Sequence, residues 1–237
     1  MNFNPKIVTD GLVLCLDAAD KKSYSGSGDT WYDRSGNDYD GTLENDPAFS
    51  TAVGGCLDFD GVDDKVEVGS LGTSGEFSEC SISIWFNKDT QEMTYGNLFD
   101  CNFGVVDLNK GPRMEVNAIE SQIYLYLAGD GGSYRSVTAA TSAVSDVWYH
   151  ITWVITTNAG VDQSVTPYVN GVKGSIHPTS DTAKIWDGNM AALYLGVGFT
   201  TGRYFTGRIA AFQIYDKVLS DAEVIQNFNT MRGRFGV

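Results

Sequence analysis

The strongest constraint on the fold is the alternation of side chains between Trp148 and Thr156. In this stretch, WYHITWVIT, aromatic and β-branched residues recur with a period of two, so successive side chains point to opposite faces of an extended strand. Val165–Val169 has the same character and ends in Asn170-Gly171, the dipeptide that best tolerates the positive φ angles of a type I′ turn. These features predict an antiparallel hairpin in the middle of the chain.

Further strands are predicted on both sides of this hairpin, separated by turn residues roughly every 8–12 positions. The pattern predicts one all-β antiparallel sandwich of the jelly-roll kind over residues 11–237, with residues 1–10 as an N-terminal arm that docks on a neighbour. Residues 23–55 are expected to be mostly loop. The predicted strands are Gly11–Asp17, Cys56–Phe59, Lys65–Val68, Cys80–Phe86, Asn97–Asp100, Gly104–Leu108, Arg113–Asn117, Gln122–Ala128, Tyr134–Thr138, Ala192–Val197 and Phe205–Tyr215.

A short helix is predicted after Leu219. Ser220 is a good N-cap, and Glu223 three residues later completes a capping box. Leu219 before the cap can pack on Val224 as a hydrophobic staple. Because a helix of about two turns is marginal alone, we expect it to lie against the sandwich.

The charge and the cysteines limit the partners and the compartment. The formal net charge of −14 disfavours binding to a phosphate backbone, so nucleic acid is not an expected partner. No apolar run is long enough to cross a membrane, and the N-terminus has no signal-peptide pattern. Cys15, Cys56, Cys80 and Cys101 form no CxxC motif and are predicted to be reduced and buried, in a protein made in a cytoplasm.

Four motifs between Phe59 and Phe228 resemble the laminin G-like branch of the concanavalin A-like lectin/glucanase sandwiches. They are FDGVDD at residues 59–64, SISIWF at 81–86, WYHITW at 148–153 with YVNG at 168–171, and YLG at 194–196 followed by GRIAAFQIY and LSDAE. The resemblance implies a concanavalin A-like sandwich with a carbohydrate-binding or carbohydrate-cleaving function.

The two ends of the chain resemble a type of structural protein found in tailed phages of marine bacteria. The segments that carry this likeness are residues 5–18, residues 23–43 and the closing MRGRFG at residues 231–236. The resemblance implies a virion component at the particle surface, namely a capsid decoration, fibre or tail protein. Its implied partners are other virion proteins, a host-surface glycan and further copies of this chain. A free carbohydrate-binding module or adhesin is the alternative.

A glycoside hydrolase is the third hypothesis. Glucanases of this superfamily carry catalytic carboxylates in the pattern ExDxE or ExDxxE on one strand, and this chain has Glu115, Asn117 and Glu120. Asn117 replaces the central Asp, and a turn is predicted before Gln122. We therefore expect no enzymatic activity and two exposed carboxylates on a hairpin. His150 is expected to be packed or at the surface rather than catalytic.

Two acidic loops are candidate calcium sites, with calcium in a structural role. Asp33, Ser35 and Asn37 place oxygens at alternate positions with Glu44 at the twelfth, but Asp38 stands where an EF-hand requires Gly. The other reading of this loop is a turn held by local side-chain hydrogen bonds. The second candidate is the acidic turn that contains Asp60, Asp63 and Asp64, which is also consistent with an ordinary turn.

Candidate sugar-binding residues are aromatic side chains outside the core pattern. Trp85, Trp148 and Trp153 lie in predicted strands and are expected to be core. The candidates for glycan stacking are Trp31, Tyr126, Tyr134, Trp186 and Tyr204, with Tyr124, Arg135 and Arg203 nearby in sequence.

Overall fold

The structure is a computed structural model. It describes residues 6–72, 76–77, 79–89, 95–101, 111–117, 122–128, 134–158, 162–180, 186, 188–198 and 203–237.

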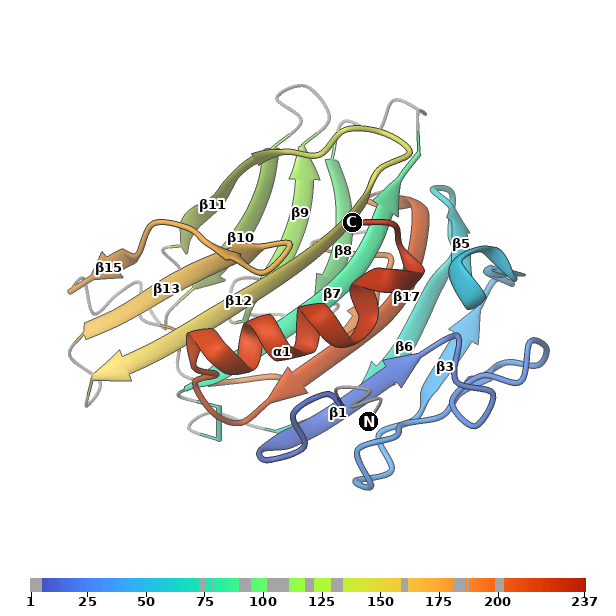
Figure 1. The fold of residues 1–237 in the computed structure, drawn as a ribbon, viewed down its shortest axis with the longest axis horizontal. Helices are drawn as coiled ribbons and strands as arrows, with labels where there is room; N and C mark the ends of the chain where they lie inside the picture. Colours follow the sequence, from blue (N-terminus) through green and yellow to red (C-terminus); the bar gives the residue numbers. More distant parts are fainter. Residues whose placement is uncertain are drawn as a thin grey trace.

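Two antiparallel sheets pack face to face, as predicted (Figure 1). In the described part of the chain the first sheet has nine strands. Its order is β14 (Val172–Lys173), β13 (Asp162–Val169), β12 (Trp148–Asn158), β7 (Cys80–Lys88), β17 (Thr206–Tyr215), β5 (Cys56–Asp60) and β4 (Ala48–Ser50), with β1 (Leu12–Asp17) also paired to β17 and β15 (His177–Thr179) to β13.

The second sheet has eight strands among the described residues. Its order is β11 (Tyr134–Ser142), β10 (Gln122–Ala128), β9 (Arg113–Asn117), β8 (Tyr95–Asp100), β16 (Leu193–Leu195), β6 (Lys65–Gly69), β3 (Gly41–Glu44) and β2 (Thr30–Trp31). The predicted central hairpin is β12–β13. The turn at Asn170-Gly171 joins β13 to β14, and its two φ angles of 49° and 76° are those that a type I′ turn requires.

The strand predictions are largely confirmed, with differences in the N-terminal segment, at β15, which was not predicted, and at several strand ends. β2, β3 and β4 lie in the segment that was predicted to be mostly loop. They are only 2, 4 and 3 residues long, too short for a period of two to be visible. β11 continues to Ser142, four residues beyond the prediction. The strand predicted at Gly104–Leu108 lies outside the described residues.

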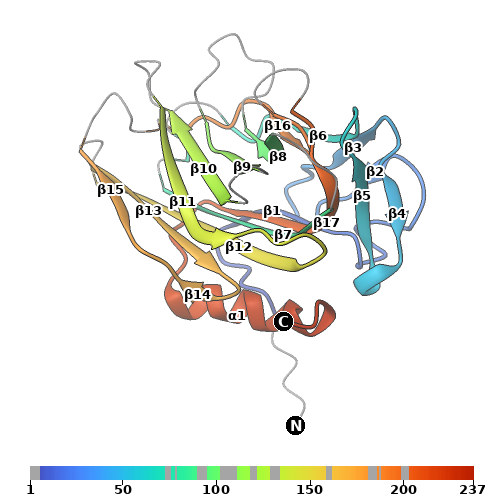
Figure 2. The ribbon, with the colours of Figure 1, turned by 90° about the horizontal axis from the view of Figure 1, so that it is seen from above.

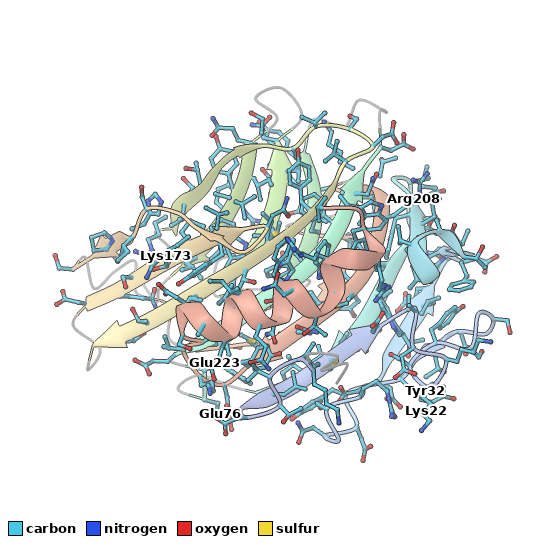
Figure 3. The ribbon with its side chains drawn as sticks, viewed as in Figure 1. Lys22, Tyr32, Glu76, Lys173, Arg208 and Glu223 are labelled. Atoms are coloured by element: carbon cyan, nitrogen blue, oxygen red, sulfur yellow. The ribbon has the colours of Figure 1, made fainter. Side chains whose placement is uncertain are left out.

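The single α-helix of the described residues, α1 (Asp221–Met231), covers the outer face of the nine-stranded sheet (Figure 2). The capping box is confirmed, because Ser220 accepts from the Glu223 amide and Glu223 accepts from the Ser220 amide. Leu219 and Val224 share one apolar cluster. Figure 3 places Glu223 near the first turn of α1, with Lys173 on the neighbouring hairpin. At 11 residues the helix is longer than predicted, and none of the described helices is long and apolar enough to cross a membrane.

The main core lies between the two sheets and draws side chains from β1 through β17. Cys15, Cys56, Cys80 and Cys101 are all buried and free, as predicted. Trp85 and Trp153 are buried as expected, and Trp148 is half-buried against Phe235. Trp85 stacks on the buried His150 at 4.8 Å and on Phe235 at 3.9 Å between ring centroids.

The described part of the predicted arm, residues 6–10, packs on the chain's own helix, and its docking on a neighbour stays a prediction. The Val8 amide donates to Asn227 Oδ1 at 2.8 Å, and the Lys6 carbonyl accepts from Gln226 Nε2 at 2.7 Å. Val8 is also buried in the cluster that contains Val224. Apolar burial and three hydrogen bonds, one of them from Tyr215 to the Val8 carbonyl, therefore fix this segment. Residues 1–5 lie outside the described residues.

Candidate functional site

The outer face of the eight-stranded sheet is the candidate site. It lies on the side of the sandwich away from α1 (Figure 2). Residues that stand directly opposite one another on antiparallel strands share a face of the sheet. A continuous row of such residues crosses all eight strands, and it consists of Ser136, Tyr126, Arg113, Asp100, Tyr194, Glu67, Thr42 and Thr30.

This row points away from the core, because the residues between its members lie between the sheets. Arg113 and Asp100, at the middle of the row, are nevertheless only 9% and 6% exposed. Met114 and Leu125, which stand opposite each other on β9 and β10, are fully buried between the sheets. With a strand spacing of about 4.8 Å, seven steps give the row a length of about 34 Å.

A second row beside the first concentrates the charge. Tyr124, Glu115 and Asn97 stand opposite one another on β10, β9 and β8. Glu115 is fully buried, and Arg203 Nη1 donates to its Oε2 at 2.8 Å. The Tyr126 hydroxyl lies 3.5 Å from Glu115 Oε1.

The arginines of this face lie over tyrosine rings. The Arg113 guanidinium lies 4.8 Å from the Tyr126 ring centroid, and Arg203 lies 4.4 Å from the ring of Tyr95. The rings of Tyr124 and Tyr126 are 5.9 Å apart. These contacts hold the tyrosines in place before any ligand arrives.

Burial shifts the titration of this cluster in the expected directions. Desolvation raises the pKa of Glu115, and the charges of Arg203 and Arg113 oppose that shift. Desolvation, followed by the charge of Glu115, raises the pKa of Tyr126 to about 12. Desolvation lowers the pKa of Arg113. Tyr126 is therefore neutral near pH 7, and its hydroxyl is directed at Glu115.

The other half of the face carries a smaller cluster around Lys65. Lys65 Nζ lies 2.8 Å from Glu44 Oε2 and 5.8 Å from the Tyr194 ring centroid. The hydrogen bond to Glu44 raises the pKa of Lys65, and the charge of Tyr204 is a smaller cause in the same direction. Tyr204 is half-buried and bridges to Val197, so it borders this part of the face.

The structure brings together only part of the predicted glycan-binding set. Tyr126 lies in the long row, and Tyr204 lies near Lys65 at its side. Tyr134 begins β11 opposite Ala128, and its side chain lies outside the described residues.

Trp31 and Trp186, which the sequence predicted to be exposed, are buried in the core at 0% and 1% exposure. Thr30 faces outward in the row, so the alternation of β2 turns Trp31 inward. The Trp186 indole donates to the Asn189 carbonyl, and its amide donates to Gln163. Neither tryptophan can offer a ring face to a sugar.

The Asp33 loop is a hydrogen-bonded turn, which is the second of the two interpretations of its sequence; calcium binding at this loop stays a prediction. Asp33 Oδ1 accepts from the amides of Cys15 and Ser35, and Oδ2 accepts from the Ser35 hydroxyl and the Tyr39 amide. Asn37 Nδ2 donates to the Val13 carbonyl at 2.9 Å. These bonds fasten the loop to β1 and engage both oxygens of Asp33, which calcium would need as ligands.

The Asp60–Asp64 turn does bring carboxylates together. Ligand atoms of Asp60, Asp63 and Asp64 lie within 4.8 Å of one another. Desolvation raises the pKa of Asp64 to about 6, and the charges of Asp60 and Asp63 add to that shift. The Asp64 carboxylate also accepts from the Asp60 amide at 2.9 Å, so part of the cluster has a role in the turn itself.

The carboxylates proposed for hydrolysis are not arranged as the sequence suggested. Glu115 is buried rather than exposed, and Asn117 ends β9 opposite Gln122. Glu120 lies outside the described residues. The buried Glu115 is engaged by Arg203 and Tyr126, so it forms a fixed polar contact in the face.

Sequence reasoning missed most of the row, including Arg113, Asp100, Glu67 and the outward role of Tyr194. The signal was present, because Arg113, Glu115 and Asn117 alternate with the apolar Met114 and Val116. The sequence carried no signal for the identity of their cross-strand neighbours, because those neighbours are far apart in the chain.

Comparison with known families agrees with this architecture. Residues 60–225 match the model of the concanavalin A-like lectin/glucanases superfamily, of the laminin G type. The chain therefore belongs to that superfamily. A search of curated proteins found none with a significant match.

Similar solved structures are binding domains of bacterial toxins. The binding domain of Paraclostridial mosquitocidal protein 1 aligns with 94% of this chain at a TM-score of 0.71 and 18% identity. The receptor binding domain of botulinum neurotoxin C/D mosaic serotype aligns with 93% at a TM-score of 0.71 and 15% identity. The botulinum neurotoxin serotype D ligand binding domain, solved in complex with N-acetylneuraminic acid, aligns with 93% at a TM-score of 0.70 and 14% identity.

This chain spans about half the length of those structures, at 52%, 51% and 51%. At these identities the likeness concerns the fold.

Proposed function

We propose that this chain is a non-enzymatic glycan-binding module that uses the outer face of the eight-stranded sheet. The observation that carries the proposal is the outward row in which Tyr126, Arg113, Asp100 and Tyr194 stand side by side. Sugar rings stack on aromatic side chains, and their hydroxyl groups bond to carboxylates and guanidinium groups. The row supplies both kinds of contact on a rigid sheet.

The charges of this face favour a neutral glycan. Lys65, Arg113 and Arg203 stand against Glu44, Glu67, Asp100 and Glu115, which is close to balance in a chain of net charge −14. Arg203 and Lys65 are already engaged by Glu115 and Glu44. An anionic sugar would have to displace a carboxylate from one of them, whereas a neutral sugar would not.

A glycan array tests this proposal, with neutral and sialylated glycans because one structural neighbour was solved with N-acetylneuraminic acid. We expect binding to neutral oligosaccharides that Tyr126→Ala abolishes and Tyr126→Phe retains. Tyr32→Ala is the matched control, because Tyr32 is 50% exposed outside the row. The proposal fails if no glycan binds, or if Tyr126→Ala binds like the unmodified protein in a folded state.

We further propose that the module is displayed on a phage particle, as a capsid decoration, fibre or tail component. The support is the resemblance of residues 5–18, 23–43 and 231–236 to phage structural proteins. Mass spectrometry of purified particles tests this role. If the protein is absent from particles and still binds glycans, a free carbohydrate-binding module or adhesin is favoured.

A glycoside hydrolase is the second candidate, because the buried Glu115 has a raised pKa beside an aromatic surface. Assays on laminarin and agar, with Glu115→Gln as the test variant, separate the two functions. Hydrolysis that is lost in Glu115→Gln would replace binding as the function of this face.

A further inference from the structure

A second surface lies on the opposite side of the sandwich, where the first residues of the chain, β1 and the end of α1 meet. They enclose a pocket of about 420 Å³. Ile7, Leu12, Cys15 and Met231 give it an apolar floor. Apart from Gln213, its lining residues lie outside residues 60–225, the part that matches the family model.

The rim of this pocket is more positive than the rest of the molecule. Arg234 bonds to both oxygens of Asp17 at 2.9 and 3.0 Å, and Arg34 lies 3.3 Å from Asp20. Lys6 is exposed and has no ion pair within the described ranges. Three cationic side chains thus face two carboxylates, although the chain as a whole has a net charge of −14.

The chain also presents a knob of matching chemistry. Val62, in the Asp60–Asp64 turn, is 68% exposed. Asp60 and Asp63 are exposed beside it. Of the exposed large apolar side chains in the described ranges, Val62 alone has carboxylates within two residues on both sides.

The knob is rigid before it meets a partner. Asp60 Oδ1 accepts from the Val62 amide at 2.8 Å, and Asp64 Oδ2 accepts from the Asp60 amide at 2.9 Å. Asn45 Nδ2 donates to the Asp63 carbonyl at 2.8 Å. Gly61 supplies the positive φ of 79° that the turn requires. Little conformational entropy remains to be lost when such a turn binds.

We propose that Val62 of one copy inserts into this pocket on a second copy, with Asp60 and Asp63 beside Lys6, the rim cation that has no ion pair within the described ranges. The apolar side chain meets the apolar floor, and the carboxylates meet the cationic rim. Because the knob and the pocket are different surfaces, the contact is heterologous and propagates head to tail. The proposal does not depend on glycan binding, which uses the other sheet.

The contact is expected to be weak. Specific stable interfaces bury roughly 1,200–2,000 Å² in total, and one turn in one pocket provides less. We therefore expect a dissociation constant on the order of 100 µM. Association should be visible by sedimentation velocity between about 10 µM and 1 mM protein, in buffer with a chelator.

The variants separate the two surfaces. Val62→Lys should weaken association at least tenfold, whereas Val172→Lys, the same change at another exposed valine, should not. Lys6→Glu should weaken it similarly, whereas Lys22→Glu, at the loop lysine labelled in Figure 3, should not. The charge exchange Lys6→Glu with Asp63→Lys should restore association.

A mixing experiment tests the head-to-tail arrangement directly. Val62→Lys retains an intact pocket and Lys6→Glu retains an intact knob, so an equimolar mixture should form dimers and nothing larger. A protein that stays monomeric at about 1 mM overturns the proposal, as does association that Val62→Lys leaves unchanged. Each variant should keep its glycan binding, so failure here and failure of the sugar site give different results.

Discussion

His150 should make the stability of this protein depend on pH in a way that one substitution removes. The imidazole is completely buried between Trp85 and Phe228, with ring centroids at 4.8 and 5.8 Å. Its Nδ1 has no hydrogen-bond partner within the described residues. Desolvation lowers the pKa of His150 from 6.5 to about 3, because the buried site favours the neutral ring.

The sign and size of the effect follow from linkage. Above pH 6.5 the ring is neutral in both the folded and the unfolded chain, so burial carries no protonation cost. Below pH 6.5 the imidazole is protonated in the unfolded chain but stays neutral in the folded chain. The free energy of unfolding therefore falls as the pH is lowered from 6.5 to about 3. At about 1.4 kcal/mol per pKa unit, the loss between pH 7.5 and 4.5 is about 3 kcal/mol.

Urea unfolding at several pH values, followed by tryptophan fluorescence, measures this loss. Other groups titrate in the same range, so the informative quantity is the difference between the unmodified protein and His150→Phe, which keeps an aromatic ring in the stack. We expect that difference to grow by about 3 kcal/mol toward pH 4.5. His177→Gln, at the other histidine, should have the same pH profile of stability as the unmodified protein. Parallel pH profiles for the unmodified protein and His150→Phe would refute the reasoning.

Three further predictions concern the turns and caps. Arg234 bonds to Asp17 and to the carbonyls of Val53 and Gly55, and so holds the C-terminal segment in place. Arg234→Met should therefore lower the free energy of unfolding by about 2 kcal/mol in chemical unfolding. An equal loss for Arg232→Met would contradict this role. Ser220→Ala removes the N-cap of α1 and should cost about 1 kcal/mol, whereas Thr230→Ala in the last turn should stay within about 0.5 kcal/mol. We propose that the turn of Asp60, Asp63 and Asp64 binds calcium. CaCl₂ at a concentration ten times its dissociation constant should then stabilise the fold by about 1.4 kcal/mol. The resulting rise in melting temperature should be reversed by EDTA and abolished by Asp63→Asn. A melting curve that is the same in CaCl₂ and EDTA would leave the turn without a metal.

Some elements of the structure could be predicted from the preferences of neighbouring residues in the sequence. The alternation from Trp148 to Thr156 predicted the central strand, and Asn170-Gly171 predicted the turn between β13 and β14, because both are backbone preferences of neighbouring residues. Ser220 and Glu223 located the start of α1 for the same reason. The order of the family motifs identified the sandwich, and residues 60–225 match that family.

Only the tertiary structure decided which side chains form the sugar-binding candidate. Tyr126, Arg113, Asp100 and Tyr194 become neighbours through strand register, which depends on pairings between segments distant in the chain. The same register turned Trp31 inward. This could not be predicted, because β2 is only two residues long and an alternation of side chains cannot be recognised in so short a strand.

The chain thus determined its strands, its cap and its acidic surface through local preferences and composition. The pairing of the strands determined which polar residues share a face, because cross-strand neighbours are set by long-range packing that no short stretch encodes. The pocket beneath Lys6 depends on tertiary structure most strongly, since it exists only where β1 and the residues before it meet the end of α1.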